Sequence, residues 1–291
     1  MSEVSPPIAL VTGATSGIGE VTARALIRQG YHVVLLARNA TKAARTQQQL
    51  QELAPPGSRA DVLLCDLSDL AQVRRAAAEF NQRYARLDVL VNNAGLVFGA
   101  ERETSADGYE MTLATNQLGP FLLTSLLLDK LRQSPAARIV NVASVAHQFA
   151  RPNLDDLNAT RQYSPMRAYA NSKLFNILFT QELARQLRQR GITNVSTNSL
   201  HPGVVASNFG SNSTWLTRAF YQVAAPFMTT SEDGAQTSIY LATAPEVAGT
   251  SGGYFVKKRP APVKSAFNTP ANVQRLWQES ERMVGQPFFA A

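Results

Sequence analysis

Short apolar segments alternate with longer amphipathic segments along almost the whole chain. The short segments are rich in Val, Ile and Leu and are typical of strands: 7–12, 31–37, 61–66, 87–93, 138–144 and 194–200. The longer segments carry apolar residues at helical spacing: 17–29, 40–53, 69–84, 107–133 and 164–190. Because nearly continuous apolar strands are buried on both faces, they belong to a parallel sheet with helices on each side. The alternation therefore predicts an α/β fold with a doubly wound parallel sheet.

The length and composition fit one domain. The chain has 291 residues, of which 45% are hydrophobic, and no repeat or long linker divides it. We expect a single domain over 1–291. Residues 204–230 interrupt the alternation with Ser, Asn, Thr and aromatic residues, and we expect a substrate loop there. A C-terminal extension begins at about 257, and its second half, 270–284, predicts a helix.

The composition excludes several classes of protein. A single cysteine, Cys65, cannot form a disulfide within the chain or a cysteine-based zinc site, and a small buried role is expected for it. The three histidines are not spaced like a metal pair, so we expect no metal site. The first residues lack the features of a signal peptide, and no run approaches the roughly 18 apolar residues of a membrane span. We therefore expect a cytoplasmic protein with no membrane span.

The chain is basic, with a net charge of +7. Its Lys and Arg residues are spread over most of the sequence, and the one compact cluster is Lys257-Lys258-Arg259. A positive field attracts nucleic acid or smaller acidic ligands. The spread favours a phosphorylated cofactor over a nucleic-acid partner.

A glycine-rich turn follows the first predicted strand and precedes the first predicted helix. It reads Thr12-Gly13-Ala14-Thr15-Ser16-Gly17-Ile18-Gly19, with the spacing Gly-x-x-x-Gly-x-Gly. Glycines there let backbone N–H groups approach a pyrophosphate, and the helix N-terminus adds positive potential. The position predicts dinucleotide binding, with these candidate contacts: Gly13, Thr15, Ser16, Gly17, Ile18 and Gly19.

The ends of the second and third predicted strands indicate which dinucleotide binds. The second strand ends at Arg38, where a carboxylate would hold the ribose 2′-hydroxyl of NAD. An arginine there can instead bind a 2′-phosphate through its two-pronged guanidinium, so NADP(H) is the expected cofactor. The third strand ends at Asp66-Leu67. Asp66 either accepts a hydrogen bond from the adenine amino group or caps the helix that begins near Asp69.

The spacing Tyr-x-x-x-Lys occurs twice, at Tyr169–Lys173 and at Tyr254–Lys258. Such a pair lies about 5–6 Å apart at Cβ on a helix. On a strand it lies about 13 Å apart. The first copy belongs to a predicted helix that starts with a Ser-Pro pair and ends before a glycine. The second copy lies in a short aromatic segment that predicts a strand, so it is expected to be structural or exposed. Tyr169 and Lys173 are therefore the candidate reactive pair.

A bound nicotinamide dinucleotide would transfer a hydride, and transfer to a carbonyl would also need a proton for the oxygen. A phenol has a pKa near 10, and the ammonium of Lys173 favours the phenolate of Tyr169, which moves that pKa toward the working pH. Ser144 closes the segment 138–144, at the carboxyl end of a strand, where ligands bind in such sheets. Its hydroxyl can polarise the substrate oxygen.

Asn116 is the fourth candidate, and it lies in the predicted helix 107–133 together with Pro120. Proline has no N–H, so the bond from residue 120 to the carbonyl of residue 116 cannot form, and the helix should kink. This leaves the Asn116 carbonyl available to a water molecule. The alternative is that the Pro120 kink serves packing alone.

These motifs, in this order, resemble the short-chain dehydrogenase/reductase family over nearly the whole chain. The resemblance is carried by TGATSGIG, Asn92-Asn93-Ala94-Gly95, Asn116, Ser144 and Tyr-x-x-x-Lys. More narrowly, the chain is similar to the retinol-dehydrogenase-like branch in these segments: LLARN, TNQLGPFLLT, VNVASVAH, YANSKLFNILFTQELARQL, LHPGVV and EDGAQTSIYLA. The resemblance implies a Rossmann fold with strand order 3-2-1-4-5-6-7 and NADP(H)-linked alcohol and carbonyl chemistry.

The resemblance also implies roles for single residues. Lys173 would hold the nicotinamide ribose, and a water would join Asn116 to Lys173. The segment Asn92-Asn93-Ala94-Gly95 would shape the cofactor pocket, although a role in holding the sheet is an equal alternative. The backbone of Pro202 and Gly203 would face the nicotinamide carboxamide, and His201 is expected to be positional rather than catalytic.

The sequence thus predicts an NADP(H)-dependent oxidoreductase that interconverts an apolar alcohol and its carbonyl. Tyr169 would act as general acid and base, assisted by Lys173, Ser144 and Asn116. The expected partner is a small-molecule substrate, and a homo-oligomer is compatible with the sequence. The alternative is a non-catalytic NADP-sensing or interaction protein on the same fold, against which the complete catalytic set argues.

Overall fold

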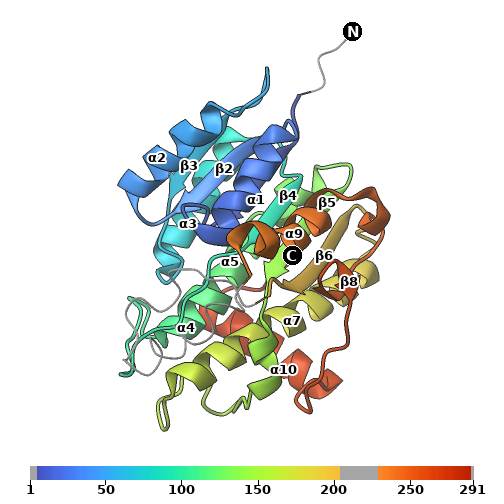
Figure 1. Ribbon diagram of the computed structural model, residues 1–291. Coiled ribbons are helices and arrows are strands. Elements are labelled where there is room, and N and C mark those ends of the chain that lie inside the picture. Colours follow the sequence, from blue (N-terminus) through green and yellow to red (C-terminus); the bar gives the residue numbers. More distant parts are fainter. Residues whose placement is uncertain (1–4, 204–228, 290–291) are drawn as a thin grey trace.

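The computed structural model describes residues 5–203 and 229–289, which form one eight-stranded sheet in the order β3-β2-β1-β4-β5-β6-β7-β8 (Figure 1). The strands β1 to β7 run parallel to their neighbours, and β8 is antiparallel to β7. Their bounds are β1 Ile8–Thr12, β2 His32–Ala37, β3 Ala60–Leu64, β4 Val89–Asn92, β5 Ala137–Val142, β6 Val195–His201, β7 Tyr254–Val256 and β8 Arg259–Pro260. The predicted doubly wound sheet and its strand order are confirmed, with β8 as an addition at one edge.

Helices cover both faces of the sheet (Figure 1). Their bounds are α1 Gly17–Arg28, α2 Ala40–Gln51, α3 Leu70–Arg83, α4 Met111–Leu113, α5 Gly119–Leu126, α6 Leu128–Arg132, α7 Pro165–Gln189, α9 Ser231–Thr243 and α10 Pro270–Val284. One core cluster joins the sheet to α1, α2 and α9, and the other joins it to α3, α5, α6 and α7. The strands β1, β2 and β4 contribute side chains to both clusters, because their apolar residues alternate between the two faces. This explains why those strands read as continuous apolar runs.

The predicted helix 107–133 is wrong as a single element. The segment contains α4, a π-helical turn η1 (Ala114–Leu118), α5 and α6. Pro120 lies in the first turn of α5, where its missing N–H costs little. The turn before it widens, and the Gly119 N–H bonds to the Ala114 carbonyl five residues back. The expected interruption at Pro120 is therefore present as a π-helical turn, and Asn116 lies inside that turn.

Among the described residues, the helix α9 and the strand β8 were not predicted from the sequence. The segment of α9 mixes small and polar residues, and only its Thr230 N-cap, which accepts from the Asp233 N–H, gives a clear local signal. β8 is two residues long and pairs with β7 across Lys257 and Lys258, which both have positive φ angles. The second Tyr-x-x-x-Lys copy therefore starts on a strand and ends in a turn, as expected for a structural pair. Tyr254 is buried and Lys258 is exposed.

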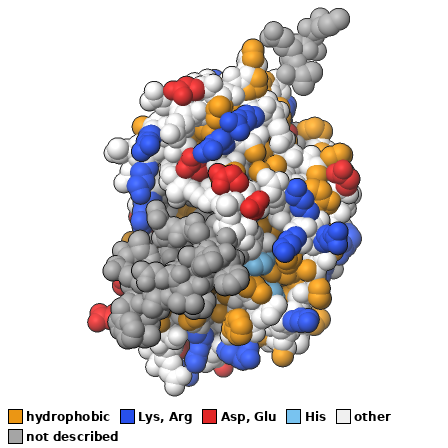
Figure 2. All heavy atoms as spheres, viewed as in Figure 1, with side chains coloured by type: hydrophobic (Ala, Val, Ile, Leu, Met, Phe, Trp, Pro, Cys, Tyr) orange, Lys and Arg blue, Asp and Glu red, His pale blue; other side chains and the backbone are white. Residues whose placement is uncertain are grey.

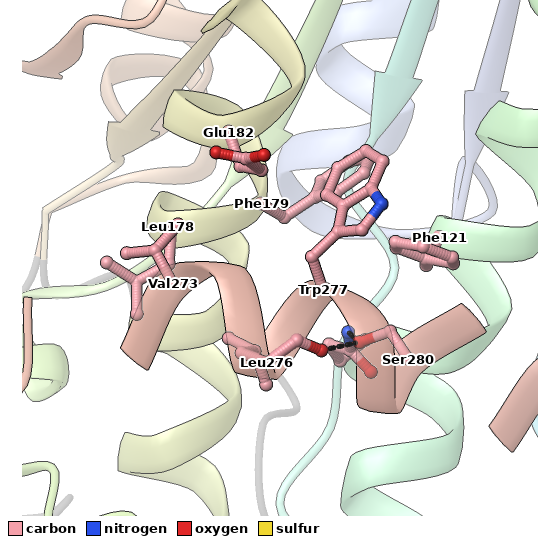
Figure 3. A pocket seen from close by; sticks show the side chains of 9 residues that line it. Phe121, Leu178, Phe179, Glu182, Val273, Leu276, Trp277 and Ser280 are labelled. Atoms are coloured by element: carbon pink, nitrogen blue, oxygen red, sulfur yellow. Dashed lines mark hydrogen bonds between the residues drawn. The ribbon is translucent and has the colours of Figure 1, made fainter. Parts of the chain in front are cut away.

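The C-terminal extension packs against the outer side of α7 and α5. Its helix α10 has the predicted bounds, and Trp277 projects from it toward Phe121 and Phe179 (Figure 3). The cavity between these helices holds only about 10 Å³, which is the space of roughly one water molecule. This region is therefore a packed part of the core and not a ligand site.

The described residues also bear on the predictions made from composition. Cys65 is buried, and burial raises the pKa of its thiol to about 12. None of the described helices has the length and apolar character needed to cross a bilayer. Lys and Arg side chains form several separate groups on the face seen in Figure 2. Most of the predicted substrate loop, 204–228, lies outside the described residues.

Candidate active site

The candidate residues gather at the carboxyl edge of the sheet, where β1, β4, β5 and β6 end. The glycine turn follows β1, Asn93-Ala94-Gly95 follows β4, Ser144 follows β5 and Pro202-Gly203 follows β6. The helix α7 passes this edge and brings Tyr169 and Lys173 to it. In open parallel sheets, ligands bind at this edge.

The glycine turn requires glycine at several positions, because of its backbone conformation and its close contacts. Gly13 and Gly17 have φ angles of 64° and 56°, which only glycine adopts without strain. A Cβ on Gly19 would lie 2.4 Å from the Gly13 carbonyl oxygen and 2.4 Å from the Asn93 side chain. The turn therefore packs tightly against the end of β4 and leads directly into α1. The other candidate contacts on this stretch are Thr15, Ser16 and Ile18.

Asn93 joins the glycine turn to the end of β4. Its side-chain amide donates to the Thr12 and Gly13 carbonyls at 2.9 and 3.3 Å. In return, the Thr12 hydroxyl accepts from the backbone N–H groups of Asn93 and Ala94, both at 2.9 Å. Asn92 donates to the Thr124 hydroxyl of α5 and to the Asn141 side chain of β5. The geometry favours the structural alternative for both asparagine side chains and leaves Ala94 and Gly95 at the edge.

Arg38 extends into solvent from the end of β2. Its side chain is 65% exposed and its partner is Asp66, at 3.5 Å, a weak surface contact. The Asp66 carboxylate accepts from the Ser68 N–H and hydroxyl. The N-cap of α3 is Asp69, which accepts from the Gln72 N–H. The capping alternative for Asp66 is therefore wrong.

Leu67 belongs to the core, beside the start of α5. A Cβ on Gly119 would lie 2.2 Å from the Leu67 carbonyl oxygen, so the two backbones are in close contact. Leu67 itself is buried. This contact holds the end of β3 against the helix that follows the π-helical turn.

Tyr169 and Lys173 lie on one face of α7, as the spacing predicted. The Lys173 Nζ is 5.6 Å from the centre of the Tyr169 ring. Ser164 occupies the N-cap position of this helix, although its hydroxyl makes no capping hydrogen bond. Lys173 is fully buried, and its ammonium donates to the Val142 carbonyl at 2.9 Å. Burial lowers the pKa of Lys173 to about 8, so its ammonium still carries a charge at neutral pH.

Asn116 and Gly95 complete the surroundings of Lys173. The Asn116 side chain accepts from the Leu96 N–H at 2.9 Å and donates to the Leu96 carbonyl at 2.9 Å. It also donates to the hydroxyl of Ser172 at 3.1 Å. The sequence analysis concerned only the Asn116 carbonyl. It did not predict the hydrogen bonds of the Asn116 side chain to Leu96 or the contribution of Ser172. A Cβ on Gly95 would lie 2.9 Å from the Lys173 Nζ, so the glycine lets the ammonium approach the backbone.

Ser144 is held in an extended conformation immediately after β5. Its φ is −157°, and its hydroxyl oxygen accepts from the Ala146 N–H at 3.2 Å at the start of the 3₁₀ turn η2 (Val145–Phe149). Gly203 has a φ of 95°, and a Cβ there would meet Thr229 at 3.0 Å. Pro202 and Gly203 continue from the end of β6.

The arrangement suits a nicotinamide dinucleotide. The backbone N–H groups of the glycine turn and of the start of α1 would hold the pyrophosphate. Arg38 would face the adenosine ribose, and its weak contact with Asp66 leaves the guanidinium available. Lys173, with Tyr169 beside it, would lie at the nicotinamide end.

Comparison with known proteins agrees with this geometry. The family model of the short chain dehydrogenases matches residues 7–215. Retinol dehydrogenase 14 of Mus musculus is 41% identical over 95% of this chain and 85% of its own length. A crystal structure of a protein from Mycobacterium paratuberculosis has a TM-score of 0.78 and 30% identity, and covers 98% of this chain and 97% of its own.

A second solved structure carries a cofactor. It is a short chain dehydrogenase from Burkholderia cenocepacia J2315 in complex with NADP, with a TM-score of 0.67 and 25% identity over 86% of this chain and 95% of its own. The fold, the order of the motifs and these relatives all agree. The chain belongs to the short-chain dehydrogenase family of oxidoreductases, in its retinol-dehydrogenase-like branch.

Proposed function

We propose that this protein is an NADP(H)-dependent oxidoreductase that interconverts an apolar alcohol and its carbonyl. The observation that carries the proposal is the buried ammonium of Lys173, one helical turn from Tyr169 and bonded to Val142, the last residue of the strand that precedes Ser144. A buried charge is costly, and the contacts of Lys173 are a carbonyl and an aromatic ring rather than a carboxylate. Such a charge is typical of a functional site.

The residues have distinct tasks in this reaction. When bound, NADP(H) supplies or accepts the hydride. Tyr169 gives its phenolic proton to the substrate oxygen in reduction and takes it back in oxidation. The Lys173 ammonium stabilises the negative charge on the phenolate oxygen in between. The Ser144 hydroxyl donates to the same substrate oxygen and orients it, and Asn116 holds the Leu96 backbone in place beside the lysine.

Exposed apolar side chains near these residues support an apolar substrate. The described residues leave five large apolar side chains exposed: Leu64, Leu96, Val145, Phe149 and Met166. Four of them belong to segments of the site, since Leu96 follows Gly95, Val145 and Phe149 follow Ser144, and Met166 lies in the first turn of α7. Ligand pockets for apolar molecules combine such surfaces with a few polar groups. The similarity to a retinol dehydrogenase points in the same direction.

Replacement of Tyr169 by Phe tests the reaction. We expect turnover to fall by at least the roughly 10²–10⁴-fold typical of general acid catalysis, while NADPH still binds. The substrate panel is a set of apolar aldehydes and ketones, with NADPH oxidation as the readout. Tyr254→Phe is the matched control, because Tyr254 begins the same spacing on a strand, and it should keep full activity. Loss of activity in Tyr254→Phe and not in Tyr169→Phe would refute the assignment.

Replacement of Arg38 by Asp tests the cofactor. The wild type should bind NADPH more tightly than NADH, because a guanidinium contact with the phosphate is stronger than an ordinary hydrogen bond. The variant should lose this preference through weaker NADPH binding, measured by titration of both cofactors. Arg28→Asp, an exposed arginine at the end of α1, is the charge-matched control. Equal wild-type affinities, or an unchanged preference in Arg38→Asp, would exclude the proposed role.

A further inference from the structure

Two histidines from different elements hold the same peptide group beside Ser144. His147, in η2, lies with its Nδ1 2.8 Å from the Ser144 carbonyl oxygen. His201, the last residue of β6, accepts from the Val145 N–H through its Nδ1 at 3.2 Å. The Ser144 carbonyl and the Val145 N–H belong to one peptide unit. The two imidazoles therefore contact both polar atoms of the peptide that follows the candidate catalytic serine.

The partners fix the tautomer of each ring. A carbonyl oxygen only accepts, so His147 must carry its proton on Nδ1. The Val145 N–H only donates, so His201 must lack a proton on Nδ1 and is neutral with its proton on Nε2. Burial lowers the pKa of His147, and burial together with the nearby His147 lowers the pKa of His201 to about 4. Both shifts favour the neutral form of the rings, which is the form that the two hydrogen bonds require.

The burial of His147 leaves one of its two ring nitrogens without a hydrogen bond among the described residues. Its side chain is 1% exposed, its ring packs against that of Tyr254 at 5.1 Å, and its Nε2 has no hydrogen-bond partner among the described residues. A buried polar atom without a partner destabilises a fold, so it calls for an explanation. The hydrogen bond from Nδ1 to the Ser144 carbonyl supplies one. An apolar residue would fill the same space without the unsatisfied nitrogen.

The chain on the other side of Ser144 is held as well. The Val142 carbonyl accepts from the Lys173 ammonium at 2.9 Å, and the Ala143 N–H donates to the Leu200 carbonyl at 2.8 Å. Together with the two histidines, these bonds fix the backbone on each side of Ser144. Among the described residues, the hydrogen-bond partner of the Ser144 hydroxyl is the Ala146 N–H, at 3.2 Å.

We propose that His147 and His201 are positioning residues that set the Ser144 hydroxyl for the substrate oxygen by holding the Ser144–Val145 peptide from both sides. The inference rests on the function proposed above for Ser144. The effect of His201 should be the larger, because the Ser144 carbonyl also accepts from the backbone N–H of His147 at 3.1 Å and keeps that bond when the His147 side chain is removed.

Substitution of the same histidine by Asn and by Gln separates the effect of the lost hydrogen bond on turnover from the effect of the lost ring. His201→Asn places an amide oxygen near the position of Nδ1, whereas His201→Gln places it near the position of Nε2. Turnover of a carbonyl substrate with NADPH should stay near the wild-type value in His201→Asn. It should fall on the order of 10²-fold in His201→Gln, the loss typical of a misplacement of about 1 Å, with little change in the KM for NADPH. Turnover should likewise be higher in His147→Asn than in His147→Gln, but the difference between these two variants should be smaller than at position 201.

His32→Asn is the control for loss of a buried histidine, because the asparagine amide does not reach the position of the Nε2 that bonds to Asp61. His32 lies on β2, bonded to Asp61 at 2.7 Å and away from Ser144, so this variant should lower the melting temperature without changing kcat. Equal kcat in the Asn and Gln variants at position 201, whether both high or both low, would overturn the inference.

Combination with Ser144→Ala separates this inference from the proposed function. If the histidines act through the serine hydroxyl, His201→Gln should lower kcat much less in the Ser144→Ala background than alone, because effects of residues that act as one unit are not additive. Full and independent losses would show that the histidine acts by another route. Wild-type activity in Ser144→Ala itself would overturn the proposed role of the serine, which is a different failure.

Discussion

At the scale of single residues, the site depends on close approaches that only one residue type permits. Gly95 is the clearest case, because a Cβ there would lie 2.9 Å from the Lys173 Nζ and 3.4 Å from the Asn116 side-chain oxygen. The nearest atom is the end of a flexible side chain, so the fold can accommodate an added methyl group. The ammonium itself would have to move, however, and with it the charge beside Tyr169.

Gly95→Ala should therefore reduce activity more than stability. We expect kcat to fall by about tenfold or more, since displacements of about 1 Å at a reacting group cost up to about 10²-fold. The melting temperature should change little. Gly99→Ala is the control, because a Cβ at that position would meet only the Glu103 side chain, at 3.8 Å. A Gly95→Ala enzyme with normal kcat would mean that the position of the ammonium is not critical.

The sequence predicted the site residues that lie close together within one helix. It missed the contacts between residues that are far apart in the sequence. Tyr169 and Lys173 were found because helical spacing alone places them together. The Asn116 side chain bonds to a backbone segment 20 residues away, and Thr12 bonds to residues 81 and 82 positions along the chain. No spacing rule within one element encodes such pairs. The same reason explains why the histidine contacts with the Ser144–Val145 peptide were not foreseen beyond a positional role for His201.

At the scale of elements, apolar spacing and capping residues predicted where helices and strands lie better than they predicted where a helix is interrupted. The helix α10 has the predicted bounds, because Thr269 caps it, Pro270 begins it and Gly285 ends it in a left-handed conformation. The segment 107–133 failed as one helix, and Pro120 marked the place of the interruption but not the widened turn before it. Apolar spacing stays helical through a π-helical turn, so the sequence pattern does not reveal it.

The packing of α10 gives a prediction about stability. Trp277 is buried and lies against Phe121, Phe179 and Phe288, with ring centres 4.8–5.9 Å apart. Trp277→Ala should reduce the free energy of unfolding by about 3–5 kcal/mol, as large-to-small changes in a core do. Chemical denaturation with two optical probes would measure it.

A surface change on the same helix is the control for Trp277→Ala. The side chain of Arg282 is 70% exposed and pairs with Glu279, so Arg282→Ala should change the free energy of unfolding by less than about 1 kcal/mol. The folded fraction of Trp277→Ala should keep the wild-type kcat, because α10 lies on the outer side of α7. Similar losses of stability in both variants would mean that the aromatic cluster does not anchor the helix.

At the scale of the whole molecule, buried neutral histidines link stability to pH. Burial lowers the pKa of His147 and His201, the latter to about 4, whereas the unfolded chain has the ordinary histidine value near 6.5. The stabilisation from each neutral ring is thus complete above pH 6.5. Below that pH the unfolded state takes up protons that the folded state excludes, so stability falls toward pH 4.

The melting temperature should therefore drop steadily as the pH is lowered from about 7 to about 5, before most carboxylates titrate near pH 4. Each such histidine contributes a slope of at most about 1.4 kcal/mol per pH unit. Scanning fluorimetry across this range would measure the drop, and His201→Asn should make it shallower, because asparagine does not titrate. His32 is a weaker contributor to the pH dependence, since the neighbouring Asp61 opposes the effect of its burial on its pKa.

A melting temperature that stays level down to pH 5 would mean that the imidazoles of His147 and His201 accept protons in the folded state. The hydrogen bond from the Val145 N–H to His201 could then not persist, and the positioning of Ser144 by that ring would fail with it.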